Sequence, residues 1–502
     1  MDSQDFREAA ISSIDEIINY YDNISSRDVV SNVSPGYLRT LLPTSAPVQG
    51  EAWATIQSDM ETKILPGITH WQHPNFHAFF PCATSYPSIL GELYSAALSG
   101  ACFNWICSPA VTELETIVLD WLAKLLCLPG CYLSTGSTRG GGVIQGSASE
   151  AVLTAMVAAR EKYLLETVPS DLSEEEREDV IAHKRAKMVV LATNMTHSST
   201  KKAALILGVR FKSISVRAED GYALTAPVLA SALEECRAKG LEPFFLTATL
   251  GTTDTCAVDD FRGISEALEA YIYPPGSPGE VWVHVDAAYA GAALVCPEFQ
   301  ASTKIEQIAK FHSFDMNMHK WLLTNFDASC LFVRNRNWFV QALSINQAVY
   351  GNAASDGGLV TDYREWQIPL GRRFRSLKIW FVLRSFGVEG LHGYIRRTVK
   401  MGEDFAGWVK GREDLFEVIT GPAFALTVFR MVGDGEEMRN ERTRALCERV
   451  NGSGRMWVTS TLLDGSRFAI RFMTGVRSTE ERHVRAAFEL LVEVAEEIVN
   501  KK

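Results

Sequence analysis

One stretch of the chain, Val281-Trp282-Val283-His284-Val285-Asp286, decides how the rest is arranged. Its first five residues favour β-structure and predict a fully buried strand. An aspartate stands at the carboxyl end of this strand, and small residues fill positions 287–292. Open α/β sheets bind their ligands at the carboxyl ends of parallel strands. We therefore expect Asp286 to lie beside a ligand.

A lysine further along the chain gives this aspartate a chemical partner. Lys320 lies in the apolar segment 317–323, directly after His319. A partly desolvated lysine has a lowered pKa and becomes a nucleophilic amine. An aspartate that holds a protonated pyridine nitrogen and a lysine that forms a Schiff base are the minimum that pyridoxal 5'-phosphate (PLP) requires. The pair favours a PLP site over a helix-capping aspartate and a surface lysine.

The glycine-rich segment 136–150 offers a place for a phosphate group. Ser147 and Glu150 have the spacing of a capping box, which would open a helix that continues to about residue 163. Free N–H groups at a helix N-terminus, together with serine hydroxyls, bind phosphate. The segment lacks the Gly-Lys-Ser/Thr of a Walker A loop. We favour a phosphate site over an ordinary glycine-rich turn.

Composition excludes several classes of protein. The 502 residues are 47% hydrophobic and 22% charged, with a formal net charge of -11, which disfavours a nucleic-acid partner. No apolar run approaches the length of a membrane span, and the acidic start is not that of a signal peptide. The ten cysteines include no CxxC pair, which predicts a cytoplasmic protein with reduced core cysteines such as Cys127, Cys296 and Cys330.

Strands that alternate with helices predict the α/β class. Apolar runs at 188–192, 244–249, 281–285 and 329–333 predict strands of a mostly parallel sheet with helices on both faces. We expect three parts: an N-terminal helical segment over 1–88, a large α/β domain over 89–387 and a small C-terminal α+β domain over 388–502. The last part should contain strands at 424–429 and 468–472 and a helix over 480–499, with Ser478 or Thr479 as its N-cap.

The N-terminal segment holds two predicted helices, over 5–22 and 55–64. They cannot bury their apolar faces on each other alone, so they must pack on the large domain or on a second subunit. The segment 68–81 that follows is dense in aromatic and histidine residues and fits a core, a metal site, a ligand pocket or a subunit interface. Its histidines have no acidic companion at metal-ligand spacing, so we favour an aromatic wall over a metal site.

The motifs, taken in order, resemble those of the PLP-dependent aromatic-L-amino-acid decarboxylases, members of the group II decarboxylases. The resemblance spans nearly the whole chain and rests on segments 41–43, 66–71, 108–115, 140–150, 248–253, 284–289, 317–321 and 366–374. It implies a fold-type-I PLP-dependent transferase fold. It also implies decarboxylation of an aromatic amino acid, and a homodimer with shared active sites.

The resemblance also implies roles for individual residues. Lys320 would carry PLP, Asp286 would pair with the pyridine nitrogen, and His197 would stack on the ring. The remaining cofactor-binding residues would be Ser147, Ala148, Ser149, Thr249, Ala288, Asn317 and His319. The substrate-binding residues would be Trp71, Phe79, Phe80, Pro81, Cys82, Phe103, His197 and Gly371. Cys82 stands where many relatives have threonine.

The glycine-rich segment 352–358 predicts a mobile loop that closes the site. The family places a catalytic tyrosine in this region, which protonates the substrate carbon after CO2 leaves. Its spacing from Lys320 falls on Val349, and Tyr350 comes one place later. Tyr350 is our first candidate for this donor and His197 the second. Relatives without the tyrosine form aldehydes with oxygen.

Three hypotheses follow. The first is a decarboxylase of tryptophan, 5-hydroxytryptophan, phenylalanine, tyrosine or DOPA that forms the aryl-ethylamine. Gly371 favours tryptophan, because in the plant branch glycine here accompanies indolic substrates. The second is an oxygen-dependent aromatic aldehyde synthase. The third is a non-catalytic dimeric binding protein, which the joint presence of Lys320, Asp286 and His197 disfavours.

Overall fold

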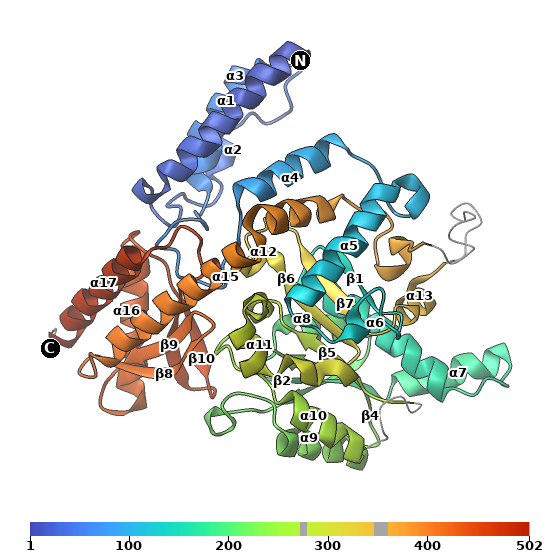
Figure 1. Cartoon of the computed structure of the whole chain (residues 1–502). Coiled ribbons are helices and arrows are strands. Elements are labelled where there is room, and N and C mark those ends of the chain that lie inside the picture. Colours follow the sequence, from blue (N-terminus) through green and yellow to red (C-terminus); the bar gives the residue numbers. More distant parts are fainter. Residues whose placement is uncertain (272–278, 346–359, 501–502) are drawn as a thin grey trace.

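A seven-stranded sheet forms the centre of the structure, a computed structural model that describes residues 1–271, 279–345 and 360–500 (Figure 1). The strand order is β1-β7-β6-β5-β4-β2-β3. Strand β7 runs in the direction opposite to the other six strands, and all pairs that do not include it are parallel. The predicted mostly parallel sheet is thereby confirmed. The strands are β1 (Gly141–Gln145), β2 (Met188–Thr193), β3 (Arg210–Ile214), β4 (Glu242–Thr249), β5 (Trp282–Asp286), β6 (Ser313–Asn317) and β7 (Ser329–Val333).

Helices cover both faces of this sheet, as predicted. Alternate residues of one strand enter different apolar cores: Leu191 of β2 belongs to a core that includes residues of α5, α9 and α10, whereas Val190 belongs to one that includes residues of α6 and α8. The helices of this part are α4 (Tyr86–Ala97), α5 (Pro109–Leu125), α6 (Ala148–Thr167), α7 (Glu174–Arg185), α8 (Ser198–Leu207), α9 (Ala226–Ala238), α10 (Phe261–Tyr271), α11 (Pro297–Thr303), α12 (Met318–Trp321) and α13 (Asn337–Leu343).

A long helix, α15 (Arg375–Lys410), joins the large sheet to the C-terminal part (Figure 1). Gly387 interrupts it with φ 61° and ψ 178°, a conformation that favours glycine. The division at 387/388 stays a prediction, which this break supports. Beyond it lies an antiparallel sheet of order β10-β11-β9-β8. Its elements are β8 (Phe416–Ala423), β9 (Leu426–Met431), α16 (Gly435–Gly452), β10 (Thr459–Leu463), β11 (Arg467–Met473) and α17 (Glu481–Asn500).

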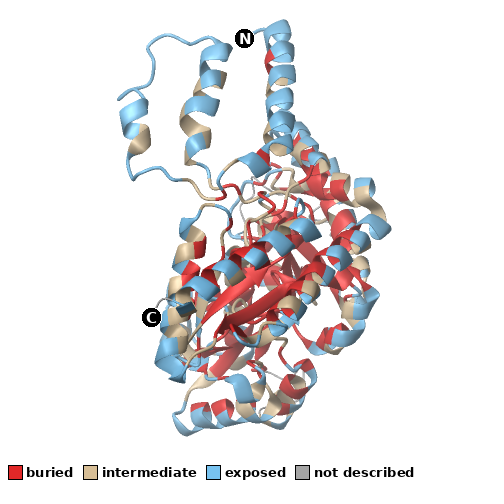
Figure 2. Ribbon diagram, turned by 90° about the vertical axis from the view of Figure 1, so that its left-hand side faces the viewer, coloured by how far each residue is buried: buried red, intermediate tan, exposed pale blue. Residues whose placement is uncertain are grey.

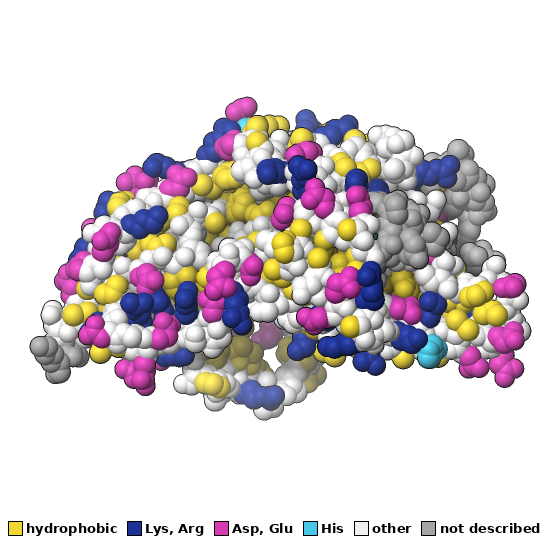
Figure 3. Space-filling model, turned by 90° about the horizontal axis from the view of Figure 1, so that it is seen from below, with side chains coloured by type: hydrophobic (Ala, Val, Ile, Leu, Met, Phe, Trp, Pro, Cys, Tyr) yellow, Lys and Arg dark blue, Asp and Glu magenta, His cyan; other side chains and the backbone are white. Residues whose placement is uncertain are grey.

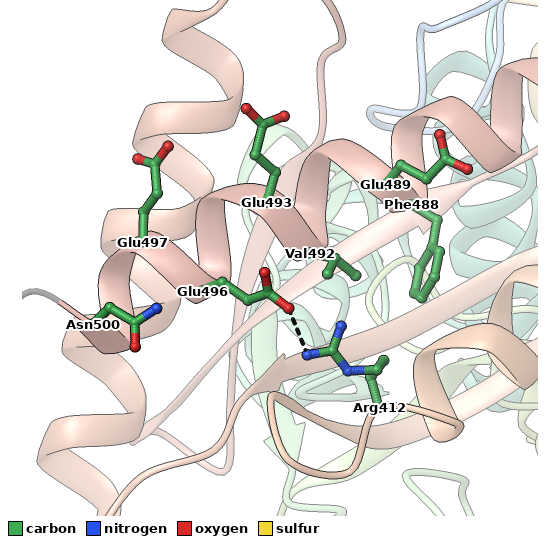
Figure 4. Close-up of a pocket in the computed structure, with 8 residues that line it drawn as sticks. All are labelled: Arg412, Phe488, Glu489, Val492, Glu493, Glu496, Glu497 and Asn500. Atoms are coloured by element: carbon green, nitrogen blue, oxygen red, sulfur yellow. Dashed lines mark hydrogen bonds and ion pairs between the residues drawn. The ribbon is translucent and has the colours of Figure 1, made fainter.

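The last helix is amphipathic, as expected. Phe488 and Val492 of α17 lie on the side of Arg412, while Glu489, Glu493 and Glu497 point away from it (Figure 4). Arg412 forms an ion pair with Glu496 at 2.9 Å. The predicted N-cap is wrong, because α17 begins at Glu481 and Glu480 directly precedes it. The hydroxyls of Ser478 and Thr479 donate to the carbonyls of Gln72 and Pro74.

The N-terminal helices project from the rest of the chain (Figures 1 and 2). Ala9 is the one buried residue of α1. Ile14, Ile17 and Ile18 are 46%, 39% and 42% exposed. This chain alone therefore leaves the apolar face of α1 uncovered. The elements here are α1 (Ser3–Asp22), α2 (Tyr37–Leu41), α3 (Trp53–Asp59) and a π-helical turn (Met60–Ile64).

The histidine-rich segment 68–81 connects the N-terminal helices to the C-terminal part. His70 Nδ1 lies 2.9 Å from the Tyr20 hydroxyl. His77 Nδ1 donates to the Met473 carbonyl at 2.8 Å, and the His77 ring stacks on Phe472. Buried Phe76 packs with Val29, Ala78 and Val476. Much of the segment therefore serves as a core between parts of the chain.

Surface properties bear on two further expectations. Cys127 is exposed, so its prediction as a core residue is wrong, whereas Cys296 and Cys330 are buried. Acidic and basic side chains are interspersed over the face that Figure 3 shows. Among the described residues, no helix combines the length and apolar character needed to cross a membrane.

Candidate active site

A cavity of about 200 Å³ lies at the carboxyl ends of β4, β5 and β6. All ten residues expected to bind PLP line it, although they come from five separate segments of the chain. They are Ser147, Ala148, Ser149, His197, Thr249, Asp286, Ala288, Asn317, His319 and Lys320. This convergence is the site geometry that the sequence predicted.

Three adjacent strands end at the cavity, and each places a polar residue at its last position. Thr249 ends β4, Asp286 ends β5 and Asn317 ends β6. Thr249 and Asp286 are register partners on neighbouring strands. The Ala288 N–H donates to Asp286 Oδ1 at 3.0 Å and thereby orients the carboxylate. The parallel arrangement thus gathers these side chains at one sheet edge.

Lys320 belongs to the short helix α12, directly after β6. Its Nζ lies 5.6 Å from the ring centroid of Phe80, which also lines the cavity. Burial lowers the pKa of Lys320, and the nearby carboxylates of Asp286 and Asp315 oppose this shift. A lysine with a lowered pKa is available as a neutral amine nucleophile.

His197 is the N-cap residue of α8. Its Nδ1 accepts from the Ser199 backbone N–H at 3.2 Å and lies 2.9 Å from the Ser199 hydroxyl. The neutral ring therefore carries its proton on Nε2. Burial lowers the pKa of His197, and the charge of Asp286 opposes this shift. The ring is held neutral and in one orientation at the edge of the cavity.

The N-terminus of α6 forms another wall. Ser147 Oγ accepts from the Glu150 N–H at 3.2 Å, as predicted. The reciprocal half of the capping box is wrong, because the Glu150 carboxylate accepts from the Gly146 N–H at 2.8 Å instead. The first N–H groups of a helix have no partner within it and favour an anion. Ser147, Ala148 and Ser149 thus present a phosphate-binding edge.

His319 is fixed from behind. Its Nδ1 accepts from the Ala328 N–H at 2.8 Å, and its ring lies 4.1 Å from the ring of Phe326, centroid to centroid. Burial and the charge of Lys320 lower the pKa of His319 to about 3. Neutral His319 therefore carries its proton on Nε2, where it can donate to an acceptor.

The buried polar atoms of the cavity fit PLP. Thr249 Oγ1 and Asn317 Oδ1 are buried and have no hydrogen-bond partner among the described residues. Unpaired buried polar atoms carry a free-energy cost that a ligand can remove. Asp286 supplies an anion for a pyridinium nitrogen, and Lys320 supplies an amine. The α6 N-terminus supplies donors for a phosphate. The donor set therefore matches each polar end of the cofactor.

Most of the residues expected to bind the substrate do not line the cavity. Phe80 and His197 line the cavity, whereas Trp71, Phe79, Pro81, Cys82, Phe103 and Gly371 are not part of its lining in this chain. Trp71 stacks on Phe79 at 5.5 Å, and Phe79 contacts Trp457. Gly371 is exposed, and a Cβ added to it would meet no atom within 4 Å. Tyr350 lies outside the described residues.

Four further residues line the cavity without having been predicted: Gly251, Thr253, Tyr289 and Phe326. The Tyr289 ring stacks face to face on Phe80 at 3.8 Å and on Trp321 at 4.8 Å. Gly251, Thr253 and Tyr289 belong to the motifs that carry the resemblance, which could have indicated them. Phe326 lies outside every such motif.

Comparisons with known proteins agree with this geometry. The pyridoxal-dependent decarboxylase conserved domain matches residues 35–432. Tryptophan decarboxylase 2 of Oryza sativa subsp. japonica is 41% identical over 506 residues, which cover 100% of this chain and 96% of that protein. Phenylacetaldehyde synthase of Arabidopsis thaliana is 43% identical over 506 residues, which cover 100% and 98%.

A solved structure of Oryza sativa TDC with PLP and tryptamine aligns with a TM-score of 0.92 at 37% identity. The alignment covers 100% of this chain and 99% of that one. The fold and the cofactor expected from the sequence are thereby confirmed. The chain belongs to the pyridoxal-dependent decarboxylase family, in its group of aromatic amino acid decarboxylases and related aldehyde synthases, and its cofactor is PLP.

Proposed function

We propose that the enzyme decarboxylates an aromatic L-amino acid to the aryl-ethylamine and CO2, with tryptophan as the favoured substrate. The observation that carries the proposal is the convergence of Lys320, Asp286 and His197 on one cavity beside the N-terminus of α6. The relative named tryptophan decarboxylase 2 supports the choice of substrate. The other candidates are 5-hydroxytryptophan, phenylalanine, tyrosine and DOPA.

PLP, when bound, accepts the electrons released as the bond between the substrate Cα and its carboxylate breaks. Lys320 would hold the cofactor covalently and release it to the substrate amine. Asp286 would keep the pyridine nitrogen protonated through its negative charge. Ser147, Ala148 and Ser149 would bind the phosphate. His197, oriented by Ser199, would lie on the ring and fix its plane.

A proton must reach the substrate carbon after CO2 leaves. We assign this step first to Tyr350 and second to His197, whose Nε2 carries a proton in the neutral ring. Tyr350 lies one place beyond the position that the family spacing gives, which is occupied by Val349. The identity of the proton donor is tested by substitution of Tyr350, Val349 and His197.

The same offset supports a second candidate function, an oxygen-dependent aromatic aldehyde synthase. Phenylacetaldehyde synthase is 43% identical to this chain over its full length. In such a reaction the substrate loses CO2 and is oxidised by O2 at the carbon that carries the amine. Hydrolysis by water then releases the aldehyde and ammonia, and O2 is reduced to hydrogen peroxide.

Aromatic side chains would select the substrate. Phe80 lies in the cavity wall between the Lys320 amine and the buried Tyr289 ring. The exposed Phe79 and the half-buried Trp71 and Phe103 would complete the pocket of a second subunit, as the family resemblance implies. Two identical chains would then share each active site.

The uncovered apolar face of α1 supports this homodimer. The apolar side chains of Ile14, Ile17 and Ile18 stay exposed to solvent in a single chain. Their regular spacing forms a stripe that a second copy would bury. Leu90, Leu93 and Leu98, on or next to α4, are exposed as well. We propose the α1–α4 region as the subunit interface.

Product analysis tests the proposed function. Purified enzyme with PLP is incubated in air with tryptophan, tyrosine, phenylalanine or DOPA, and CO2, amine, aldehyde and hydrogen peroxide are measured together. Equal amounts of amine and CO2 would support decarboxylation, and aldehyde with peroxide would support the second function. A lack of any turnover, with a cofactor band that survives Lys320→Ala, would overturn both and favour a binding protein.

A further inference from the structure

A second, fully buried carboxylate lies next to Asp286, on the neighbouring strand of the sheet. Asp315 on β6 is the register partner of Asp286 on β5. The two strands are parallel, so paired residues point to the same face of the sheet. His284, two residues before Asp286, points to this face too and lies 3.0 Å from Asp315. The side chains of His284 and Asp315 are 0% and 1% exposed.

A chain of hydrogen bonds leads to this carboxylate. Trp282 Nε1 donates to Ser313 Oγ at 2.8 Å, because an indole nitrogen can only donate. The Ser313 hydroxyl, which lies 2.8 Å from His284 Nδ1, can then donate to that nitrogen. His284 consequently carries its proton on Nε2 and donates it to Asp315 Oδ1. Each donor points toward Asp315, so the carboxylate is held as an acceptor.

The other oxygen of this carboxylate has no such partner. Asp315 Oδ2 is buried without a hydrogen bond to any described residue. A buried carboxylate with an unpaired oxygen requires a nearby positive charge to remain ionised. Its charge interacts with Lys320, whose pKa Asp315 and Asp286 both raise against the effect of burial. The positive groups of the cofactor site are thus the natural counter-charges of Asp315.

We propose that Asp315 is a positioning residue of the cofactor site, which adds a second negative charge beside Asp286. This charge would favour the protonated states of the pyridine nitrogen and of the nitrogen that Lys320 contributes. The inference rests on the proposed roles of Asp286 and Lys320. His284 would act through Asp315 by fixing the direction of its carboxylate.

The surroundings of Asp315 account for its sensitivity to pH. His284 and Asp286 face it from β5 and Lys320 from α12, and its charge also acts on the Cys330 thiol of β7, which lies on the other face of the sheet. Burial raises the pKa of Asp315, the hydrogen bond from His284 lowers it and the charge of Asp286 raises it, and together these effects place it at about 6. Asp315 is therefore expected to be mostly ionised at pH 8 and mostly protonated at pH 5.

Spectroscopic titration of the holoenzyme tests the proposal. The visible absorbance of bound PLP is followed from pH 5 to 10, and the dissociation constant of PLP is measured, for wild type and Asp315→Asn. Loss of the charge should lower the apparent pKa of the absorbance change by about 1 pH unit and weaken PLP binding several-fold. Asp404→Asn is the matched control, because it removes a carboxylate from the exposed face of α15. It should change neither quantity.

A second pair of variants separates charge from structure. His284→Gln keeps a donor to Asp315 and keeps the charge, so it should shift the apparent pKa by less than half as much. Asp315→Ser replaces Asp315→Asn if the latter is insoluble, since its hydroxyl can still accept from His284. An unchanged apparent pKa in folded Asp315→Asn, or an equal shift in Asp404→Asn, overturns the proposal. If the Lys320→Ala variant keeps the PLP absorbance band of the wild type, the proposed cofactor site itself is overturned.

Discussion

The Arg372 guanidinium and the Glu115 carboxylate form a buried ion pair at 2.6 Å, with side chains 3% and 1% exposed. The same Glu115 oxygen accepts from the Ile144 N–H of β1 at 2.8 Å, and Arg372 lies over the Tyr363 ring. The pair therefore connects α5 and β1 with the segment that leads into α15.

Removal of one partner should destabilise the protein strongly. Glu115→Ala leaves the Arg372 cation buried and unpaired, which costs about 3–5 kcal/mol in the free energy of unfolding. The control is Glu298→Ala, which breaks the Arg396–Glu298 pair with side chains 50% and 46% exposed. That change should cost less than about 1 kcal/mol. Urea unfolding of both variants makes the comparison, and equal midpoints would contradict the prediction.

Histidine burial should make the protein less stable in acid. Burial lowers the pKa of His77 to about 4, below the 6.5 expected in the unfolded chain. Both states are neutral above pH 6.5, so stability is complete there. As the pH falls from 6.5 toward 4, the unfolded chain binds a proton that the folded chain does not, and stability is lost. His73 and His312 also have pKa values of about 4 and act in the same direction.

A single substitution isolates the share of His77. His77→Gln can still donate to the Met473 carbonyl but does not titrate. The wild type should lose about 2 kcal/mol more than this variant between pH 7.5 and pH 5, since each pKa unit is worth ~1.4 kcal/mol. His183→Gln on the exposed surface of α7 is the control and should follow the wild type. Parallel pH profiles for His77→Gln and wild type would show that His77 titrates equally in both states.

The sequence predicted the strands that consist of apolar runs and missed those that do not. Met188–Thr193 and Trp282–Asp286 are apolar because both faces of the parallel sheet are covered. Gly141–Gln145 looked like a loop, yet its glycines belong to a strand. A Cβ on Gly142 would lie 2.9 Å from Phe332, and one on Gly141 would lie 3.1 Å from Trp366. Close packing, which no local pattern reveals, requires glycine there.

The strand β6 was missed for a chemical reason. Ser313, Asp315 and Asn317 alternate with apolar residues, a pattern that suggests an exposed face, but all three are buried. Ser313 and Asp315 bond to His284, and Asn317 lines the cavity. Functional groups thus break the pattern on which sequence analysis depends.

For the site, a strand or helix end brings several of the predicted residues to one cavity, while their roles stay predictions. Asp286, Thr249 and Lys320 are such residues, and all line the cavity. The predicted aromatic wall is only partly present, because Phe79 packs against Trp457 of the C-terminal part. Phe326 enters the cavity from an irregular segment whose course depends on contacts far away in the sequence.

Charged residues on α1 should separate the subunits if the proposed interface is right. Ile14→Asp with Ile17→Asp places two carboxylates in the apolar stripe, where burial without a partner is costly. Sedimentation should then give the mass of a monomer, and activity should fall with it because the sites are proposed to be shared. Leu205→Asp with Ile206→Asp is the matched control, since these α8 residues are 68% and 61% exposed. If the protein stays dimeric with the α1 substitutions but becomes monomeric with the α8 substitutions, the interface lies at α8 and the proposed interface is wrong.

The product of the reaction should depend on the pair Val349 and Tyr350, which lie outside the described residues. If Tyr350 protonates the substrate carbon, Tyr350→Phe should shift the product from amine toward aldehyde and hydrogen peroxide, because the carbanion persists and meets O2. A positioned proton donor accelerates such a step by about 10²–10⁴-fold, so the rate of amine formation should decrease by a factor in that range. Both products are measured from one reaction, with CO2 as the internal reference for turnover.

The reverse substitution settles which of the two positions is used. Val349→Tyr restores the family spacing from Lys320 and, in the Tyr350→Phe background, should return the product to amine. Val349→Phe is the control, as it adds the ring without the hydroxyl. If wild type already forms aldehyde and Val349→Tyr converts it to amine, the one-place offset has changed the reaction itself, and the enzyme is an aldehyde synthase. If Tyr350→Phe has no effect and His197→Asn abolishes amine formation, the proton comes from the histidine.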